Sequence, residues 1–216
     1  MNWCLSRDLI EANPAAALRR PHKTRIRSQV LGDEEFRGIW QAAVELGYPF
    51  GPVAQLLMLT GQRRGEVCRM RWPDVDLKEC LWVMGDSKGG RPHAVPLVER
   101  ACAVLGGLPQ LGPYVFSTRR DRPVSGLSKA KQRLDEAAGV EGWIFHDLRR
   151  TVRTALARLG FEKHICDRVL GHVTADISRH YDHWEYLPQK RAALAAWAGE
   201  IERIIEGAPA KVVGIR

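Results

Sequence analysis

The sequence is organised around Phe145-His-Asp-Leu-Arg149, which is followed by Leu170-Gly-His172 and then by Arg179-His-Tyr181. These three short runs collect cations, imidazoles and a phenol. His146 and Arg149 are three residues apart, so a helix over this stretch would turn both side chains toward one site. A guanidinium beside an imidazole suits an anion better than a cation. The pattern therefore predicts an anion site.

Tyr181 is the candidate nucleophile of this set. It lies nine residues after His172, which is close enough for a compact helical turn and return to bring both side chains to the same anion. The phenol is the only nucleophile among the collected groups. Tyr186 is its rival, but positions five residues apart lie about 140° apart on a helix, so only one of the two can face the site.

The composition favours a polyanionic partner. The 216 residues contain 33 Lys and Arg against 25 Asp and Glu, which gives a formal net charge of +8. Nucleic acid is the leading candidate for such a basic chain. The length is enough for one substantial core, so a single mostly helical domain is the default expectation.

The cysteines and the N-terminus exclude several classes of protein. The five cysteines are scattered and form no C-x-x-C pair, which indicates neither a disulfide framework nor a thiolate zinc site. Asp8 and Glu11 interrupt the N-terminus, and no apolar run approaches membrane-spanning length. We expect a soluble protein of a reducing compartment.

Apolar periodicity predicts a helical main domain that begins at Gly32-Asp33-Glu34-Glu35. Acidic residues favour a helix N-terminus there, and a stripe at helical spacing follows, made of Phe36, Ile39, Trp40, Ala43 and Val44. Further helices are expected over residues 53–59, 63–70, 98–105, 126–138, 146–159, 163–170 and 188–205. Ahead of the domain, Trp3 to Ala17 has the pattern of the last turns of a helix. The basic residues between 19 and 27 indicate an exposed linker, either solvated or in contact with phosphate.

A β-hairpin is predicted in the middle of the chain. The apolar or alternating runs Leu81–Met84 and His93–Leu97 flank the Gly-rich stretch 85–92, which carries Lys88. Pro96 argues that the second strand lies at a sheet edge. A further strand-like run is expected at 114–116.

The motifs resemble those of the tyrosine recombinase family, which includes the phage and prophage integrases. Members carry an Arg in a T-G-x-R-x-x-E context, a Lys in a hairpin before a V-P-L strand, an H-x-x-R helix, a His in an L-G-H turn and a Tyr shortly after. This chain has them in family order: Thr60-Gly-Gln-Arg63-Arg-Gly-Glu66, Lys88 before Val95-Pro-Leu97, His146-Asp-Leu-Arg149, Leu170-Gly-His172 and Tyr181. Five motifs in order are far more specific than any one of them.

The resemblance implies a mainly α catalytic domain with a small β-hairpin or three-stranded sheet. It implies an enzyme that cuts and rejoins DNA strands through a 3′-phosphotyrosyl intermediate. Arg63 and Arg149 would clamp the phosphate, because two planar guanidiniums can bind its oxygens bidentately. The family pattern makes Lys88 the general acid for the 5′ oxygen. It also has His146 assist proton transfer at Tyr181 and His172 donate a hydrogen bond to the phosphate.

The same resemblance divides the chain and names its partners. Residues 1–28 would be the end of a truncated core-binding domain with a basic linker, residues 29–206 the catalytic domain, and residues 207–216 a C-terminal tail. The implied partner is double-stranded DNA, bound by a homotetramer, with a monomer as the alternative in isolation. No cofactor and no metal are implied, and the expected location is the cytoplasm, at the nucleoid.

Three alternatives stand beside this interpretation. The chain could be a non-catalytic DNA-binding remnant of a prophage integrase, or a type IB topoisomerase, which shares the catalytic residues. A metal site is suggested by His180 and His183 with Asp182 and Glu185, but no third ligand cluster accompanies them. Taken singly, each site residue has a structural alternative. Arg63, for instance, could simply pair with Glu66. The tryptophans at 40, 72, 82 and 197 are expected in the core.

Overall fold

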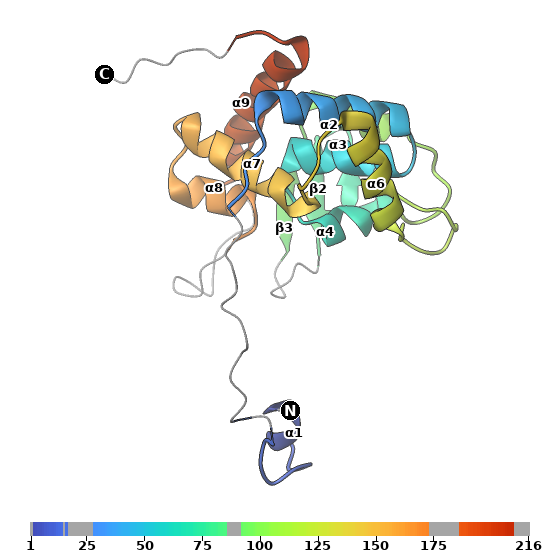
Figure 1. Cartoon of the computed structure of the whole chain (residues 1–216), viewed down its shortest axis with the longest axis vertical. Helices are drawn as coiled ribbons and strands as arrows, with labels where there is room; N and C mark the ends of the chain where they lie inside the picture. The colour runs from blue at the N-terminus through green and yellow to red at the C-terminus, as the bar shows by residue number, and fades with distance from the viewer. Residues whose placement is uncertain (1, 15, 17–27, 86–91, 173–185, 210–216) are drawn as a thin grey trace.

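A computed structural model of the chain describes residues 2–14, 16, 28–85, 92–172 and 186–209 (Figure 1). In these ranges the protein is mostly helical with a small antiparallel sheet, as the sequence predicts. The helices are α1 (Asn2–Leu5), α2 (Asp33–Leu46), α3 (Phe50–Thr60), α4 (Arg64–Cys68), α5 (Glu99–Gly106), α6 (Leu127–Ala138), α7 (Phe145–Arg158), α8 (Lys163–Val169) and α9 (Leu187–Glu206). The strands are β1 (Val75–Asp76), β2 (Leu81–Met84) and β3 (His93–Pro96), and a 3-10 turn covers Trp72–Asp74.

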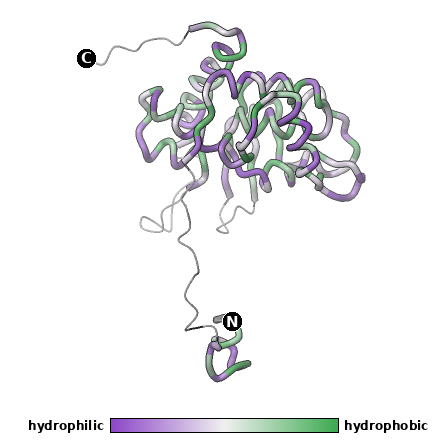
Figure 2. The backbone as a smooth tube through the Cα atoms, viewed as in Figure 1, coloured by the Kyte–Doolittle hydropathy of each residue, from purple (hydrophilic) through white to green (hydrophobic). Residues whose placement is uncertain are grey.

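Helix α3 lies at the centre of the core. Almost all of its side chains are buried, because α2, α5, α7 and α9 pack around it. A helix that is apolar on every side is stable only when it is enclosed in this way. The surrounding helices are amphipathic instead, and hydrophilic and hydrophobic residues alternate along them (Figure 2). No helix in the described ranges is both long and apolar enough to cross a membrane.

Three helices begin with the same local device. An acidic side chain in the first turn accepts the backbone N–H of the residue just before the helix, which would otherwise lack a partner. Glu35 accepts from Gly32 at 2.8 Å, Glu66 from Arg63 at 2.9 Å and Asp147 from Ile144 at 2.9 Å. The sequence therefore sets the starting points of α2, α4 and α7. Arg63 directly precedes α4, and α7 carries His146 and Arg149.

The sheet has the strand order β1-β2-β3 and is antiparallel throughout. Leu81 pairs with Pro96 and Met84 with His93, so the predicted hairpin is confirmed and Pro96 does lie in an edge strand. The third strand is β1, a two-residue run that the sequence analysis missed. The run at 114–116 contributes only an isolated bridge between Tyr114 and Arg71.

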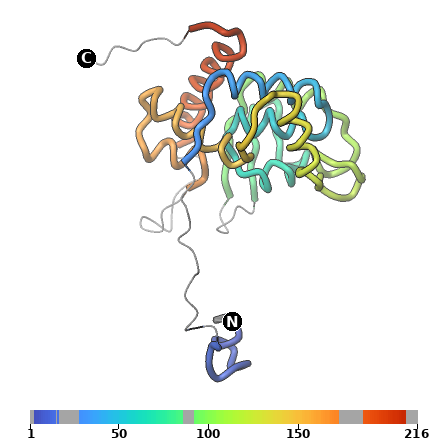
Figure 3. Tube along the Cα trace, in the orientation of Figure 1, coloured from blue at the N-terminus to red at the C-terminus, as the bar shows by residue number. Residues whose placement is uncertain are grey.

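Helix α9 packs beside α2, so the first and last helices of the main domain lie side by side (Figure 3). Trp197 is buried, stands edge-on to Phe36 with 5.4 Å between ring centroids, and donates from Nε1 to the Met58 carbonyl at 2.8 Å. The predicted stripe of α9 is confirmed, since Ala193, Leu194, Trp197, Ile201 and Ile204 are all buried. Of the four tryptophans expected in the core, Trp40 and Trp82 are also buried, and Trp72 is partly buried against it.

Two expectations for the first part of the chain are wrong. The helix expected from Trp3 to Ala17 is only one turn long, Asn2–Leu5, and turns and bends follow. Val44 is expected in the core stripe of α2 but is 57% exposed, because it lies at the edge of the buried face that holds the rest of the stripe. The basic linker 19–27 and most of the tail 207–216 lie outside the described residues.

Candidate functional site

Two turns from distant parts of the chain meet at the candidate site: Thr60–Gln62 after α3, and Leu170–Gly171 after α8. Gly61 has φ +64°, and a Cβ there would lie 2.8 Å from a Leu170 methyl carbon, so only glycine fits. Gln62 is buried and donates from Nε2 to the Val169 carbonyl at 2.8 Å. These contacts hold the two turns against each other and so fix the relative positions of their backbones.

Arg149 of α7 joins both turns. Its Nη1 donates to the Gly61 carbonyl at 2.9 Å, and its Nη2 donates to the Leu170 carbonyl and lies 2.9 Å from Nε2 of His172. The residue is only 4% exposed. Burial, followed by the charge of Arg63, lowers the pKa of Arg149 to about 10, although Glu66 acts in the opposite direction. A buried guanidinium held by neutral groups is poised to bind an anion.

Arg63 approaches the same place from the residue before α4. Glu66 accepts the backbone N–H of Arg63 through one oxygen at 2.9 Å and its Nη1 through the other at 2.8 Å. The Nη2 of Arg63 lies 3.5 Å from the Gly171 carbonyl, at the outer limit of a hydrogen bond. The interpretation of Glu66 as a structural partner is therefore confirmed, and Arg63 still reaches the turn that Arg149 holds.

His172 stands at the end of the second turn, with 45% of its side chain exposed. Its backbone N–H donates to the Asp167 carbonyl at 2.8 Å, which closes the C-terminal turn of α8. Burial, followed by the charges of Arg149 and Arg63, lowers the pKa of the imidazole. The ring is therefore neutral at pH 7 in the free protein.

His146 occupies the first turn of α7, one turn before Arg149, and is exposed. Burial of part of the ring lowers its pKa, and the charges of Arg150, Arg149 and Arg63 act in the same direction. The charges of Arg149 and Arg63 therefore lower the pKa of both His146 and His172. We call these four residues, Arg63, His146, Arg149 and His172, the Arg–His cluster.

Two polar side chains beneath the cluster, one buried and one partly buried, were missed by the sequence analysis. The His93 ring lies directly under Gly171, where a Cβ would stand 3.2 Å from Nε2 of the ring. Burial, followed by the charge of Lys190, lowers the pKa of His93 to about 3. Lys190 of α9 is 5% exposed and donates from Nζ to the Ala94 carbonyl, and burial lowers its pKa to about 8. The only sequence signal for either residue is a polar side chain inside an otherwise apolar strand or helix face.

The two remaining predicted site residues, Lys88 and Tyr181, lie outside the described residues. However, the described residues that flank Lys88 and those that flank Tyr181 in the sequence contact each other. Strand β3 ends the hairpin that carries Lys88, and its first residue, His93, contacts the turn that precedes the Tyr181 segment. The rival nucleophile Tyr186 is described, and its ring packs under Arg168 of α8, with the guanidinium carbon 3.6 Å from the ring centroid. His164 meets the same ring edge-on.

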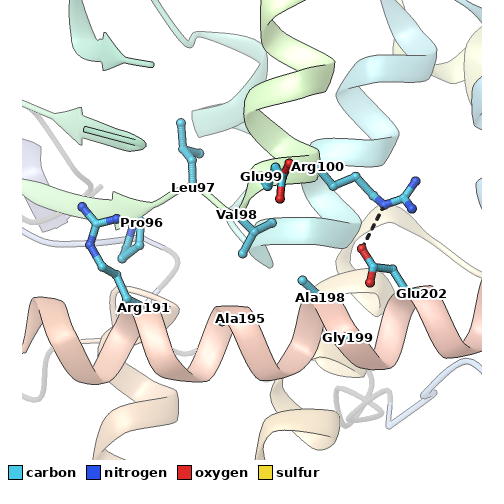
Figure 4. Close-up of a pocket in the computed structure, with 10 residues that line it drawn as sticks. All are labelled: Pro96, Leu97, Val98, Glu99, Arg100, Arg191, Ala195, Ala198, Gly199 and Glu202. Carbon is cyan, nitrogen blue, oxygen red and sulfur yellow. Dashed lines mark ion pairs between the residues drawn. The ribbon is translucent and has the colours of Figure 1, made fainter. Parts of the chain in front are cut away.

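A separate hollow lies between α9 and the segment that joins β3 to α5 (Figure 4). Its floor is formed by small residues, Ala195, Ala198 and Gly199. The ion pair of Arg100 with Glu202, 3.7 Å apart, bounds one end. None of the four predicted site residues that the structure describes lines this hollow. We therefore place the candidate site at the Arg–His cluster, where the charged groups gather.

The Arg–His cluster is suited to a phosphate. Two guanidiniums from different elements offer planar pairs of donors, and the imidazoles add two groups that can exchange protons. Of the two arginines of the cluster, Arg63 has a carboxylate partner, Glu66, at 2.8 Å. Among the described residues, no group of three or more His, Cys, Asp or Glu side chains could hold a metal ion. The metal alternative at 180–185 lies outside those residues.

The comparisons with known proteins agree on one family. The model of the phage integrase family matches residues 29–187. The tyrosine recombinase XerC of Xanthomonas campestris pv. campestris is 30% identical over 204 residues, which cover 85% of this chain and 60% of that protein. The chain thus spans less than two thirds of the length of this relative.

Two solved structures show the same fold. The lambda integrase catalytic core is 26% identical, with a TM-score of 0.53, and the match covers 72% of this chain and 98% of that one. A lambda integrase tetramer bound to a Holliday junction is 23% identical, with a TM-score of 0.59, and the match covers 84% of this chain and 57% of that one.

Proposed function

This chain belongs to the phage integrase family, and from that premise we propose that residues 29–206 cut and rejoin DNA strands as the catalytic domain of a site-specific tyrosine recombinase. The observation that carries the proposal is the convergence of Arg63, Arg149 and His172 on one turn. Arg149 bonds both the Gly61 and the Leu170 carbonyls, and its Nη2 lies 2.9 Å from the His172 ring. This is the arrangement that metal-independent cleavage of a phosphodiester needs, because the charge that grows on phosphate oxygens must be neutralised.

The proposed reaction uses six side chains. The oxygen of Tyr181 attacks phosphorus, the bond to the 5′ oxygen breaks, and a 3′-phosphotyrosine forms. Lys88 gives its proton to the leaving oxygen, and His146 takes the proton of the phenol. Arg63 and Arg149 bind the non-bridging oxygens, and His172 donates a hydrogen bond to one of them. Because the ester keeps the energy of the broken bond, a second DNA strand can displace Tyr181 without a nucleotide.

The proposed partner is double-stranded DNA, and the proposed assembly is a homotetramer on it. The formal charge of +8 supports a polyanionic partner. The tetramer is suggested by the lambda integrase structure, which is a tetramer bound to a Holliday junction. Such a substrate would place the protein in the cytoplasm, at the nucleoid.

Covalent capture tests the proposed activity. The protein would be incubated with a pool of nicked duplexes of randomised sequence, in which cleavage releases a short fragment and traps the enzyme on the DNA. We expect an adduct that survives SDS in the wild type and in Tyr186→Phe, and none in Tyr181→Phe.

Three outcomes would contradict the proposal or part of it. A mobility shift without any adduct would identify a domain that only binds DNA, as the prophage-remnant alternative requires. Relaxation of supercoiled plasmid without sequence preference would identify a topoisomerase. An adduct that disappears in Tyr186→Phe and persists in Tyr181→Phe would identify Tyr186, and not Tyr181, as the nucleophile.

A further inference from the structure

The contact between Arg149 and His172 fixes where the proton of the imidazole lies. Nη2 of Arg149 stands 2.9 Å from Nε2 of His172. A guanidinium carries only donors, so Nε2 must accept this hydrogen bond. The neutral ring then carries its proton on the other nitrogen, Nδ1. In this tautomer Nε2 has no proton to give to a phosphate.

The side chain that faces Nδ1 is Asp167 of α8. Its Oδ1 lies 3.8 Å from Nδ1, slightly beyond a direct hydrogen bond. Arg153 donates to the same oxygen at 3.0 Å and holds the carboxylate in place, whereas Lys163, 3.7 Å from Oδ2, is exposed to solvent and adds little. Although partial burial opposes ionisation, the hydrogen bond and charge of Arg153 lower the pKa of Asp167. The carboxylate is therefore charged at neutral pH.

The charges around His172 are mostly positive. Among the residues that the structure describes, Asp167 is the carboxylate that acts on its ring, and the neutral His93 lies below its turn. The cations that act on it come from α7 and from the residue before α4: Arg149, Arg153 and Arg63. Without Asp167 the imidazole would be surrounded by cations, and its protonation would be costly.

We propose that Asp167 is a positioning residue that holds the Nδ1–H of His172 and stabilises the imidazolium when a phosphate occupies the cluster. This inference rests on the proposed function. When phosphate oxygens take over the donors of Arg149, Nε2 of His172 loses its partner and accepts a proton from solvent. That Nε2–H then donates to the phosphate, while Asp167 balances the new charge through Nδ1. Catalytic hydrogen bonds that are long in the free enzyme often shorten in this way when substrate binds.

The first test does not depend on activity. Nitrogen-15 NMR of the full chain, with and without inorganic sulfate as the phosphate mimic, reports the tautomer and the pKa of His172. We expect the Nδ1–H tautomer in the free wild type. We also expect the pKa of His172 to fall by about one unit in Asp167→Asn, because a charge partner at this range contributes about that much or more. In Asp167→Glu part of the wild-type value should return.

The second test measures cleavage. If cleavage needs the protonated ring, its rate falls as pH rises through the pKa of His172, so Asp167→Asn moves this limb to lower pH by about one unit, and at a fixed pH on the limb the rate falls about tenfold. Lys163→Gln is the matched control, since Lys163 contacts the far oxygen of Asp167 and is 82% exposed. Its pH profile should equal that of the wild type.

The outcomes separate this inference from the proposed function. A wild type without any covalent adduct would refute the recombinase activity, and the NMR measurement would still decide the role of Asp167. An Nε2–H tautomer in the free wild type would overturn the inference. It would equally be overturned by an Asp167→Asn variant that is folded by circular dichroism and has an unchanged His172 pKa.

Discussion

Two arginines, one partly buried and one fully buried, show how differently the fold uses the same side chain. Arg203 of α9 is 11% exposed and donates to Asp33 at 2.6 Å, to Glu200 at 2.7 Å and to the Ala208 carbonyl at 2.6 Å. Those hydrogen bonds from Arg203 to carboxylates raise its pKa above the ordinary value. Arg149 is more deeply buried, with 4% of the residue exposed, and its partners in the described part of the chain are two carbonyl oxygens and an imidazole. Its pKa falls to about 10 because it is buried.

The difference separates a structural arginine from one that awaits a ligand. Arg203 already has its counterions, and it joins the start of α2 to the end of α9. Arg149 has its geometry fixed by backbone oxygens, which orient the guanidinium without neutralising its charge. A phosphate can supply what is missing. The comparison therefore predicts opposite responses to substitution at the two positions.

The largest expected effect is on catalysis at Arg149. Arg149→Lys keeps the charge but loses the planar pair of donors, so we expect the rate of adduct formation at saturating DNA to fall by on the order of 10²- to 10³-fold. Arg203→Lys is the matched control and should retain the wild-type rate. A rate for Arg149→Lys within a few fold of the wild type would erase the functional distinction between the two arginines.

The second prediction concerns stability at Arg203. Arg203→Met removes the hydrogen bonds to Asp33 and Glu200, both of which stay partly exposed and can be solvated again. We therefore expect the free energy of unfolding to fall by about 1–2 kcal/mol. Urea denaturation followed by circular dichroism measures this change. Cleavage by Arg203→Met at a temperature where it is fully folded should match the wild type, and a specific loss of cleavage would contradict the structural role.

Anion binding gives a third, smaller contrast. Sulfate should stabilise the wild type by occupying the Arg–His cluster, and at ten times its dissociation constant the gain is about 1.4 kcal/mol. The gain should be lost in Arg149→Lys and kept in Arg203→Met. Thermal unfolding with sodium sulfate, against sodium chloride at equal ionic strength, measures it. Equal gains in all three proteins would show that sulfate acts elsewhere or nonspecifically.

The last prediction is the pH dependence that His93 imposes. Its folded pKa of about 3 lies below the ordinary 6.5, so the unfolded chain binds more protons between these values. Stability is therefore complete above pH 6.5 and declines as pH falls toward 3, by at most about 1.4 kcal/mol per pH unit from this group. Urea titrations between pH 7 and pH 5 should show a shallower decline in His93→Gln. Identical slopes in the two proteins would mean that His93 is not protonated on unfolding in this range.

Sequence reasoning succeeded where a local signal decided the structure. The acidic residues at 33–35 predicted the start of α2, and Glu35 accepts an N–H only three residues away. The stripe on α9 and the hairpin of β2 and β3 also follow from short periodic patterns. It failed at β1, whose two residues are too few to show a period, and at Val44, where the side of α2 that is buried depends on its neighbours.

For the candidate site, the sequence by itself determined the residue types and their order: two arginines, a lysine, two histidines and a tyrosine, in five motifs that follow the order of the tyrosine recombinase family. It could not determine the partners of Arg149, since Gly61 and Leu170 are brought to it by packing across 88 and 21 residues of sequence. It also could not reveal His93 beneath Gly171 or Asp167 beside His172, because single polar residues carry no periodic signal. Motifs record which groups are present, whereas burial and proximity, which set charge and protonation, arise only when distant segments pack together.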